Sequence, residues 1–265
     1  MKDQQYPTDL SDAQWQFLEP LVCNRSGRGR PIVYSRRWVI DAILYVVRSG
    51  CQWRMLPHDF PPWKTVYQIF YRWRMNGTLE RVHDALREQL RRQEGRKAAP
   101  TAAIIDSQSV KTTEVGGEER GYDAGKKVSG RKRHLVVDTL GLLLAVVVHG
   151  AHQQDQNGAC LVLYALREKL NQIKVVFADT AYGRNGLPDF VKATLGFAIE
   201  LVKRPQGTKG FVVLTKRWVV ERTFAWIGRC RRHSKDYERN PDTSRAMIYV
   251  SMTHLMLKRL AHVDS

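Results

Sequence analysis

Two short apolar runs that each end at an aspartate constrain this chain more than any other feature. The first covers residues 102–106 and ends at Asp106, and the second covers residues 175–179 and ends at Asp179. Both runs are partly β-branched and are bounded by polar or proline-containing sequence, which predicts a buried strand in each case. An ionised carboxylate is costly to bury alone, so each aspartate is expected at a sheet edge, a cleft or a cation. For either aspartate taken singly, a turn or helix cap is the alternative interpretation.

A third acidic residue, Glu221, lies in a segment with helical periodicity. Apolar residues recur through 219–227 at a spacing that predicts one buried helical face. Arg217 and Glu221 then share one stripe of the helix. Taken alone, this pattern fits an ordinary surface pair of the two side chains. Beside Asp106 and Asp179, Glu221 is a candidate third carboxylate of a metal-binding triad.

The composition points to a polyanionic partner. The 265 residues include 43 Lys and Arg against 26 Asp and Glu, a net charge of +17 with a pI near 10.0. Such an excess favours binding to nucleic acid. No apolar stretch approaches the roughly 20 residues that span a bilayer, and the first residues lack the apolar core of a signal peptide, so we expect an intracellular protein without a membrane partner. The four cysteines form no C-x-x-C pair, which excludes the usual zinc-ribbon and redox motifs.

The first 95 residues have helical periodicity and contain five of the seven tryptophans, which predicts a small helical domain. Prolines at 57, 61 and 62 interrupt the pattern before a helix expected over residues 63–76, an order that suits a helix-turn-helix. That helix is expected to expose Lys64, Gln68, Arg72 and Arg74, side chains that can contact phosphates or base edges. A solvated basic face on a structural helix is the alternative.

A polar segment ending at Pro100 predicts a linker, and strand patterns begin after it. We expect strands near 102–110, 133–139, 142–148, 174–179 and 197–202, with helices near 156–170 and 186–195. Three strands before the first helix predict an α+β domain with a mixed sheet rather than a repeating βαβ fold. Gly141 is expected in a tight turn, and Asp138 beside it as a turn residue. The helix of Glu221 is expected to be the last element.

Four ordered blocks make a resemblance specific. Residues 105–112, 125–134, 178–183 and 220–226 closely resemble the DDE transposases of bacterial insertion sequences, and the group of insertion sequence five in particular. The resemblance covers nearly the whole chain. It implies a ribonuclease H-like catalytic domain over residues 101–265, preceded by a DNA-binding domain for terminal repeats over residues 1–95.

The glutamate signature of this family, Y-x2-R-x3-E-x6-K, is matched in part. Arg217 and Glu221 stand where its arginine and glutamate are expected, but Leu214 replaces the tyrosine and Gly228 replaces the lysine. The departure leaves the carboxylate assignment in place and weakens the DNA contacts expected around it. Arg229, one position later, is a candidate substitute for the lysine.

By this resemblance the chain is expected to bind terminal inverted repeats and target DNA as a dimer or larger assembly, in bacterial cytoplasm close to the nucleoid. Asp106, Asp179 and Glu221 would be both the catalytic residues and the ligands of Mg2+ or Mn2+. Hard cations prefer such oxygen donors, and a pair of them activates the attacking oxygen and stabilises the leaving oxygen in phosphodiester cleavage. The expected DNA contacts are Lys64, Arg72, Lys111, Arg131, Lys132, Arg133, Arg217, Arg222 and Arg229.

Several alternatives stay open. Residues 126–133 are expected to form a basic loop that contacts DNA, or else a solvated loop. His149, His152 and Asp155 have a spacing that suits metal ligands, but local caps and backbone hydrogen bonds are the preferred interpretation. At the level of function, the alternatives are a nuclease of the same fold that cuts without joining ends, and a non-catalytic DNA-binding derivative.

Overall fold

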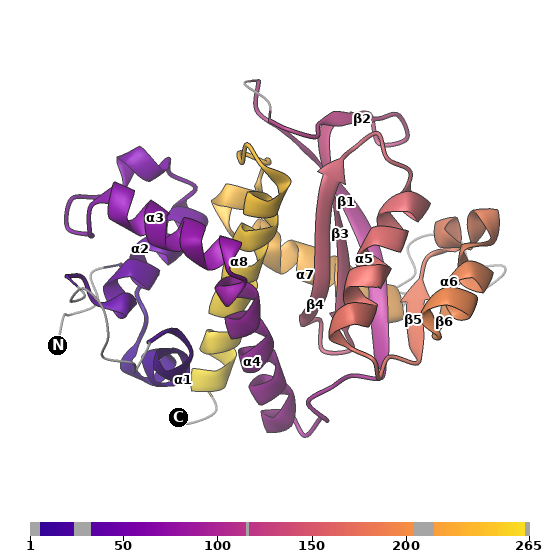
Figure 1. The fold of residues 1–265 in the computed structure, drawn as a ribbon, viewed down its shortest axis with the longest axis horizontal. Helices are drawn as coiled ribbons and strands as arrows, with labels where there is room; N and C mark the ends of the chain where they lie inside the picture. Colours follow the sequence, from indigo (N-terminus) through magenta and orange to yellow (C-terminus); the bar gives the residue numbers. More distant parts are fainter. Residues whose placement is uncertain (1–5, 24–32, 115–116, 204–214, 263–265) are drawn as a thin grey trace. The chain divides into compact units, whose positions relative to one another are not determined.

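The chain divides into two compact units. The computed structural model describes residues 6–23, 33–114, 117–203 and 215–262. A helical unit comprises residues 1–96, 229–234 and 246–265, and a sheet unit comprises residues 97–228 and 235–245 (Figure 1). The boundary after Arg96 falls inside the predicted linker. The two C-terminal segments, by contrast, group with the helical unit, whereas the sequence-based division placed them in the catalytic domain.

The helical unit is built from short helices with clear start and stop signals. Its elements are α1 (Asp12–Val22), α2 (Arg36–Ser49), the 3₁₀ turns η1 (Trp53–Met55) and η3 (Arg231–His233), α3 (Trp63–Met75), α4 (Thr78–Gln93) and most of α8 (Pro241–Ala261). Ser11 caps α1 by accepting a hydrogen bond from the amide of Gln14. Gly50 ends α2 in the left-handed conformation, which residues with a side chain rarely adopt. The predicted helical character of this region is confirmed.

Helix α8 corrects the expectation that the helix of Glu221 is the last element. From Ala246 onward its residues belong to the helical unit, where Met247, Ile248 and Leu257 are at most 1 % exposed. The Tyr249 hydroxyl also donates to Glu80 Oε1 on α4 at 3.1 Å. These buried side chains explain why the C-terminal residues pack with helices that lie far earlier in the sequence.

The sheet unit contains the mixed sheet that the sequence predicts. Its strands are β1 (Ala102–Lys111), β2 (Gly121–Asp123), β3 (Val128–Asp138), β4 (Leu143–Gly150), β5 (Val175–Ala178) and β6 (Ala198–Leu201). β3 is antiparallel to β1, β2 and β4, whereas β5 is parallel to both β1 and β6. β1 therefore lies in the middle of the sheet with β3 on one side and β5 on the other. The short strand β2 was not predicted.

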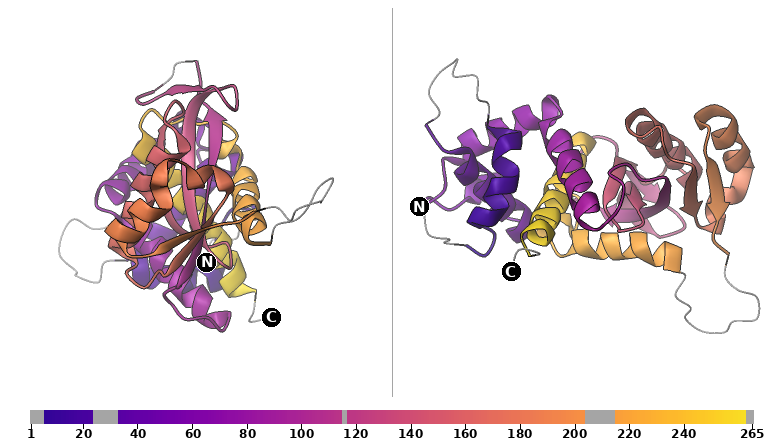
Figure 2. Two further views of the ribbon diagram at one scale, coloured as in Figure 1. Left: turned by 90° about the vertical axis from the view of Figure 1, so that its right-hand side faces the viewer. Right: turned by 90° about the horizontal axis from the view of Figure 1, so that it is seen from below.

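Helices cover both faces of this sheet (Figure 2). α5 (Asp155–Lys169) and α6 (Leu187–Leu195) pack on one face, against a core that includes Ala103 and Ile105 of β1. α7 (Thr215–Gly228) packs against β1 and β3 on the other face. Because side chains alternate along a strand, Ile104 and Asp106 are directed to the face that carries α7.

The turn between β3 and β4 is formed as predicted. Asp138 is fully buried and its Oδ1 accepts hydrogen bonds from the amides of Leu140 and Leu142, at 2.9 and 2.8 Å. Gly141 has a φ of +82°, a conformation that favours glycine. Thr223 of α7 donates to the Gly141 carbonyl at 2.9 Å, so this turn also fixes where α7 lies.

No helix in the described part of the chain is both long enough and apolar enough to span a membrane.

Candidate active site

Strand register places Asp106 and Asp179 side by side. β1 and β5 are parallel, and Ala102 pairs with Val175 while Ile104 pairs with Phe177, an offset of 73 residues. Asp106 and Asp179 are separated by the same 73 residues. Continued one residue beyond the end of β5 at Ala178, the register sets Asp179 level with Asp106 on β1, and the alternation of side chains directs both to the face of α7.

Asp179 combines a capping role with exposure to the site. It is the N-cap of the 3₁₀ segment η2 (Thr180–Gly186), and its Oδ1 accepts the amide hydrogen of Ala181 at 2.8 Å. A helix cap is the alternative to a functional role that the sequence predicts for this aspartate, and Asp179 does form such a cap. Its other oxygen, Oδ2, lies 3.9 Å from an Arg217 nitrogen, so the carboxylate also faces α7.

Arg217 joins the first two acids to the third. Its Nη2 lies 3.5 Å from Glu221 Oε1 and 3.9 Å from Asp179 Oδ2. Arg217 and Glu221 are one turn apart on α7, as the periodicity predicts, and Val220, Thr223 and Ile227 on the opposite stripe are buried. One guanidinium therefore lies between a carboxylate of the sheet and a carboxylate of the helix.

The protonation of Asp106 is shifted by this environment. Its Oδ1 accepts the amide hydrogen of Ser107 at 2.7 Å. Burial raises the pKa of Asp106 to about 6, the Ser107 amide and the Arg217 charge lower it, and the negative charge of Asp179 raises it further. Ionisation of Asp106 beside Asp179 is therefore disfavoured unless a cation compensates the negative charges.

The donor chemistry of these residues suits a divalent cation, with one adjustment. Carboxylate oxygens such as those of Asp106, Asp179 and Glu221 are the ligands that Mg2+ or Mn2+ prefers. Within the described ranges, however, no three His, Cys, Asp or Glu side chains stand close enough to hold one metal ion. Arg217 lies between Asp179 and Glu221, so closure around a metal would require this guanidinium to move aside.

A buried polar network lies behind the site, on the α5 face, and sequence reasoning missed it. Asp155 Oδ1 accepts from Ser107 Oγ at 3.0 Å and from Lys132 Nζ at 2.9 Å. One sequence feature could have indicated it. Serines alternate with larger side chains directly after Asp106, and this polar run continues the strand β1. Asp155 is therefore tied to β1 and β3, not used as a helix cap.

Two histidines complete this network. His149 donates through Nδ1 to the Gly150 carbonyl at 2.9 Å, which leaves its Nε2 to accept from His134 Nδ1, also at 2.9 Å. Burial, followed by the proximity of His149, lowers the pKa of His134 to about 3. A side chain at Gly158 of α5 would meet the His134 ring at 2.3 Å, so glycine allows the helix to approach. The backbone hydrogen bond predicted for this histidine cluster is confirmed for His149.

The structure gives Arg131, Lys132 and Arg133 a role that differs from the predicted DNA contact. The expected basic loop over 126–133 becomes strand from Val128, and the three residues are 0, 4 and 1 % exposed. Arg131 pairs with Asp236 at 3.1 Å and donates to backbone carbonyls, while Lys132 pairs with Asp155. Their donors are used inside the sheet unit, so we do not retain them as DNA contacts.

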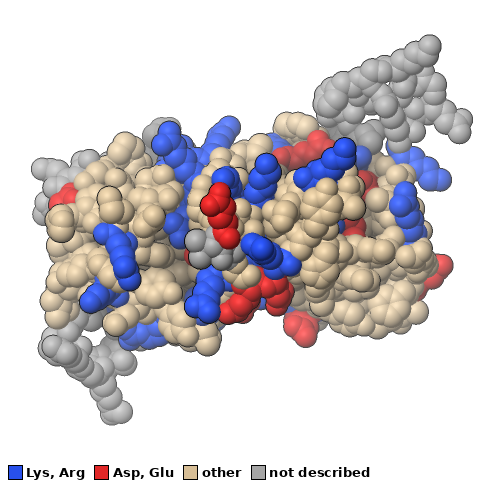
Figure 3. Space-filling view, turned by 90° about the horizontal axis from the view of Figure 1, so that it is seen from above, with Lys and Arg blue, Asp and Glu red and all other residues tan. Residues whose placement is uncertain are grey.

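The other predicted DNA contacts differ in accessibility. Lys64, Arg72, Lys111 and Arg229 are exposed. Arg222 is held between the rings of Trp218 and Trp226, at 4.6 and 4.7 Å from their centroids, and donates to the Leu140 carbonyl at 3.0 Å. Lysine and arginine side chains are spread over the face drawn in Figure 3, with acidic side chains among them. Exposed Lys126, whose Nζ donates to the Ser107 carbonyl at 3.2 Å, is a further cation near Asp106.

Of the two departures from the glutamate signature, the structure describes only Gly228. Leu214 lies outside the described residues. Gly228 is the last residue of α7, and a Cβ built there meets no atom of the described residues within 4 Å. Packing therefore does not exclude the lysine that the signature expects at this position.

In metal-free protein, we expect Asp106→Asn to be more stable than wild type above about pH 6. The raised pKa means that ionising Asp106 in the folded state costs free energy, so wild type loses stability as pH rises from about 4 to about 6. The asparagine avoids this cost, which we place at about 1–2 kcal/mol after discounting for partial exposure. Urea unfolding in EDTA at pH 8 and near pH 4 measures the difference, which should vanish at the lower pH. A variant less stable than wild type at pH 8 would contradict it, and exposed Asp189→Asn is the control.

Comparison with known proteins agrees with the architecture. The family described as "Transposase DDE domain" matches residues 97–256, and the family described as "Putative transposase of IS4/5 family" matches residues 10–83. The first of these implies that the mixed sheet has the ribonuclease H-like fold that the sequence resemblance predicts. No solved structure matches the chain.

Two bacterial relatives share parts of the sequence. The "Uncharacterized protein y4sN" of Sinorhizobium fredii is 32 % identical over 73 residues, covering 28 % of this chain and 58 % of the relative. The "Putative transposase for insertion sequence element IS402" of Burkholderia cepacia is 29 % identical over 143 residues, covering 51 % of this chain and 66 % of the relative. The chain thus spans somewhat less than two thirds of each. Because the transposase DDE domain accounts for more than half of its length, the chain belongs to the DDE transposase family, of the IS4/IS5-like type.

Proposed function

We propose that this protein is an insertion-sequence transposase that binds the terminal inverted repeats of its element and catalyses divalent-metal-dependent strand cleavage and strand transfer. One observation carries the proposal. Asp106 on β1 and Asp179 just after the parallel strand β5 stand level with each other, and Arg217 of α7 lies near both Asp179 and Glu221. Three acids that are far apart in sequence are thereby gathered around Arg217 inside a matched transposase domain.

Asp106, Asp179 and Glu221 are the residues that would hold Mg2+ or Mn2+. When bound, the metal supplies activation of the attacking water or 3′-hydroxyl and stabilisation of the departing oxygen. The chain's own residues do the rest of the work. The Ser107 amide orients Asp106, and the Ala181 amide orients Asp179, so two of the ligands are fixed before any substrate arrives.

Arg217 has a second role in this proposal. If the Arg217 guanidinium leaves Asp179 and Glu221, it stays within reach of the site because the residue is part of α7. Its paired N–H donors match the oxygens of a phosphate. Lys126 lies at the rim of the same site. These two cations would hold the scissile strand against the carboxylates.

The helical unit is the proposed reader of the terminal repeats. On α3, Lys64, Gln68 and Arg72 are exposed, one helical turn apart from one to the next. Arg74 is half-buried and lies with its guanidinium 4.8 Å from the Tyr71 ring centroid, so it is not part of this face. A helix with such a face suits the major groove. A dimer or larger assembly would be needed to hold two ends, and the site of action would be the bacterial cytoplasm at the nucleoid.

The proposal is tested by incubating full-length protein with labelled DNA carrying the element's ends and with a target plasmid. Mg2+, Mn2+ and EDTA are compared, and products are resolved on denaturing gels. Metal-dependent nicking at the ends with joined product is the expected result. Cutting without joining would replace the proposal by a nuclease of this fold, and binding without cutting in either metal would replace it by a DNA-binding derivative.

A further inference from the structure

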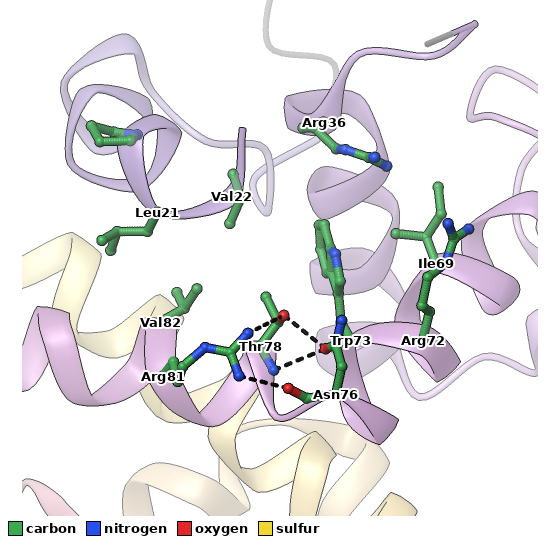
Figure 4. A pocket seen from close by; sticks show the side chains of 11 residues that line it. Leu21, Val22, Arg36, Ile69, Arg72, Trp73, Asn76, Thr78, Arg81 and Val82 are labelled. Atoms are coloured by element: carbon green, nitrogen blue, oxygen red, sulfur yellow. Dashed lines mark hydrogen bonds between the residues drawn. The ribbon is translucent and has the colours of Figure 1, made fainter. Parts of the chain in front are cut away.

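The helical unit contains a pocket of about 520 Å³ between its first four helices (Figure 4). Three arginines from three helices line it: Arg36 from α2, Arg72 from α3 and Arg81 from α4. Among the described residues that line it, none is an aspartate or a glutamate. Volumes of a few hundred cubic ångströms are typical of sites that hold a small ligand or part of a larger one.

Two of the three guanidinium groups, those of Arg81 and Arg36, have contacts within the unit, and none of the three is neutralised by a described carboxylate. Arg81 donates to the Asn76 carbonyl at 2.6 Å and to Thr78 Oγ1 at 2.9 Å, which fixes it against the turn before α4. Arg36 lies 5.8 Å from the centroid of the Trp73 ring. Among the residues that the structure describes, no ion pair joins Arg36, Arg72 or Arg81 to a carboxylate.

Three like charges around one pocket repel one another unless an anion compensates them. Guanidinium groups offer paired donors that match the oxygens of a phosphate. Apolar side chains also line the pocket, with Leu21 and Val22 on α1 and Ile69 beside Arg72 on α3. This combination suits a phosphate attached to a sugar better than a free inorganic ion.

We propose that this pocket is a phosphate site that receives a backbone phosphate of DNA through Arg36, Arg72 and Arg81. The proposal rests on the proposed function, because the phosphate is taken to belong to DNA bound by the helical unit. Arg72 connects the two features, since it lines the pocket and also lies on the exposed face of α3. The pocket would fix the register of that face on the duplex, because phosphate contacts position a protein on DNA without reading its sequence.

The test measures the affinity of full-length protein for a labelled end duplex by fluorescence anisotropy from about 50 to about 200 mM salt. A plot of log affinity against log salt concentration has a negative slope, and each lost phosphate contact makes that slope shallower by about 0.9. The affinity near 0.15 M salt falls about fivefold as a result. Arg36→Gln and Arg81→Gln are expected to show this loss. Arg92→Gln removes the same charge from the far, exposed end of α4 and is the matched control.

Because Arg81 also holds a turn, Arg36→Gln decides the outcome if Arg81→Gln lowers the melting temperature. Slopes of Arg36→Gln and Arg92→Gln that both equal the wild-type slope would overturn the proposal. Calorimetry with inorganic pyrophosphate separates the two sources of phosphate. A loss of pyrophosphate binding in Arg36→Gln with an unchanged DNA slope would assign the pocket to a free anion and also overturn the proposal.

The cleavage assay run on the same preparations separates this inference from the proposed function. If Arg36→Gln makes the salt dependence of DNA binding shallower but wild type never cuts the ends, the phosphate site is supported and the transposase proposal fails. If wild type cuts and joins while the slopes are equal, the pocket fails and the function stands.

Discussion

Asp106→Asn, Asp179→Asn and Glu221→Gln are each expected to lower metal-dependent end cleavage at least about a thousandfold. Each change removes a charged oxygen ligand from the proposed metal site, and several kcal/mol of transition-state stabilisation depend on a correctly held metal. The amides keep the size of the original side chains, so DNA binding in EDTA should be retained. Single-turnover nicking of labelled end DNA in Mg2+ measures the loss.

Asp189→Asn is the matched control for these variants. It removes a carboxylate from the same unit at an exposed position on α6 and should cut at the wild-type rate. Two variants that fail to cut beside a third that cuts normally would remove the third residue from the triad. Full activity in all three variants would reject the carboxylate mechanism.

Asp236→Ala is expected to destabilise the protein by about 3–5 kcal/mol, because it leaves the buried charge of Arg131 without its partner. The two side chains are both 0 % exposed and their atoms lie 3.1 Å apart. Asp236 also accepts from Ser244 Oγ at 2.7 Å and from the Glu238 amide at 3.1 Å. Several hydrogen bonds are therefore lost together with the ion pair, and urea unfolding at pH 7 measures the sum.

An exposed pair in the same unit provides the comparison. Asp242 and Arg245 lie 3.2 Å apart, but their side chains are 60 and 42 % exposed. Asp242→Ala should change the free energy of unfolding by less than about 1 kcal/mol. If Asp236→Ala behaved like Asp242→Ala, the interior ion pair would contribute no more than a surface pair.

The local structure around each candidate site residue was predictable from its neighbours in the chain. An apolar run that ends at an aspartate indicates a buried strand, and the separation of 73 residues equals the register of β1 on β5. The helical spacing around Glu221 likewise determines which side of α7 is buried. The strand ends and the buried side of α7 depend on neighbouring residues along the chain, whereas the pairing of β1 with β5 joins distant segments and is known only from the fold.

The buried basic strand was not predictable in the same way. Arg131, Lys132 and Arg133 lie in a run that has the composition of a solvated loop. They are buried because Asp236 and Asp155 lie beside them, and these partners come from distant parts of the sequence. A charged residue is buried only when a partner compensates it, and the partner cannot be identified until the fold is known.

The grouping of α8 with the N-terminal helices affects the order in which the protein is completed during synthesis. N-terminal domains commonly fold while the rest of the chain is still being translated. Here the helical core requires Met247, Ile248 and Leu257, so it cannot close until those residues have left the ribosome. A prematurely terminated product would expose apolar helix faces and would not accumulate as a stable fragment. Under the proposed function, repeat binding would then be restricted to chains that already carry the three carboxylates.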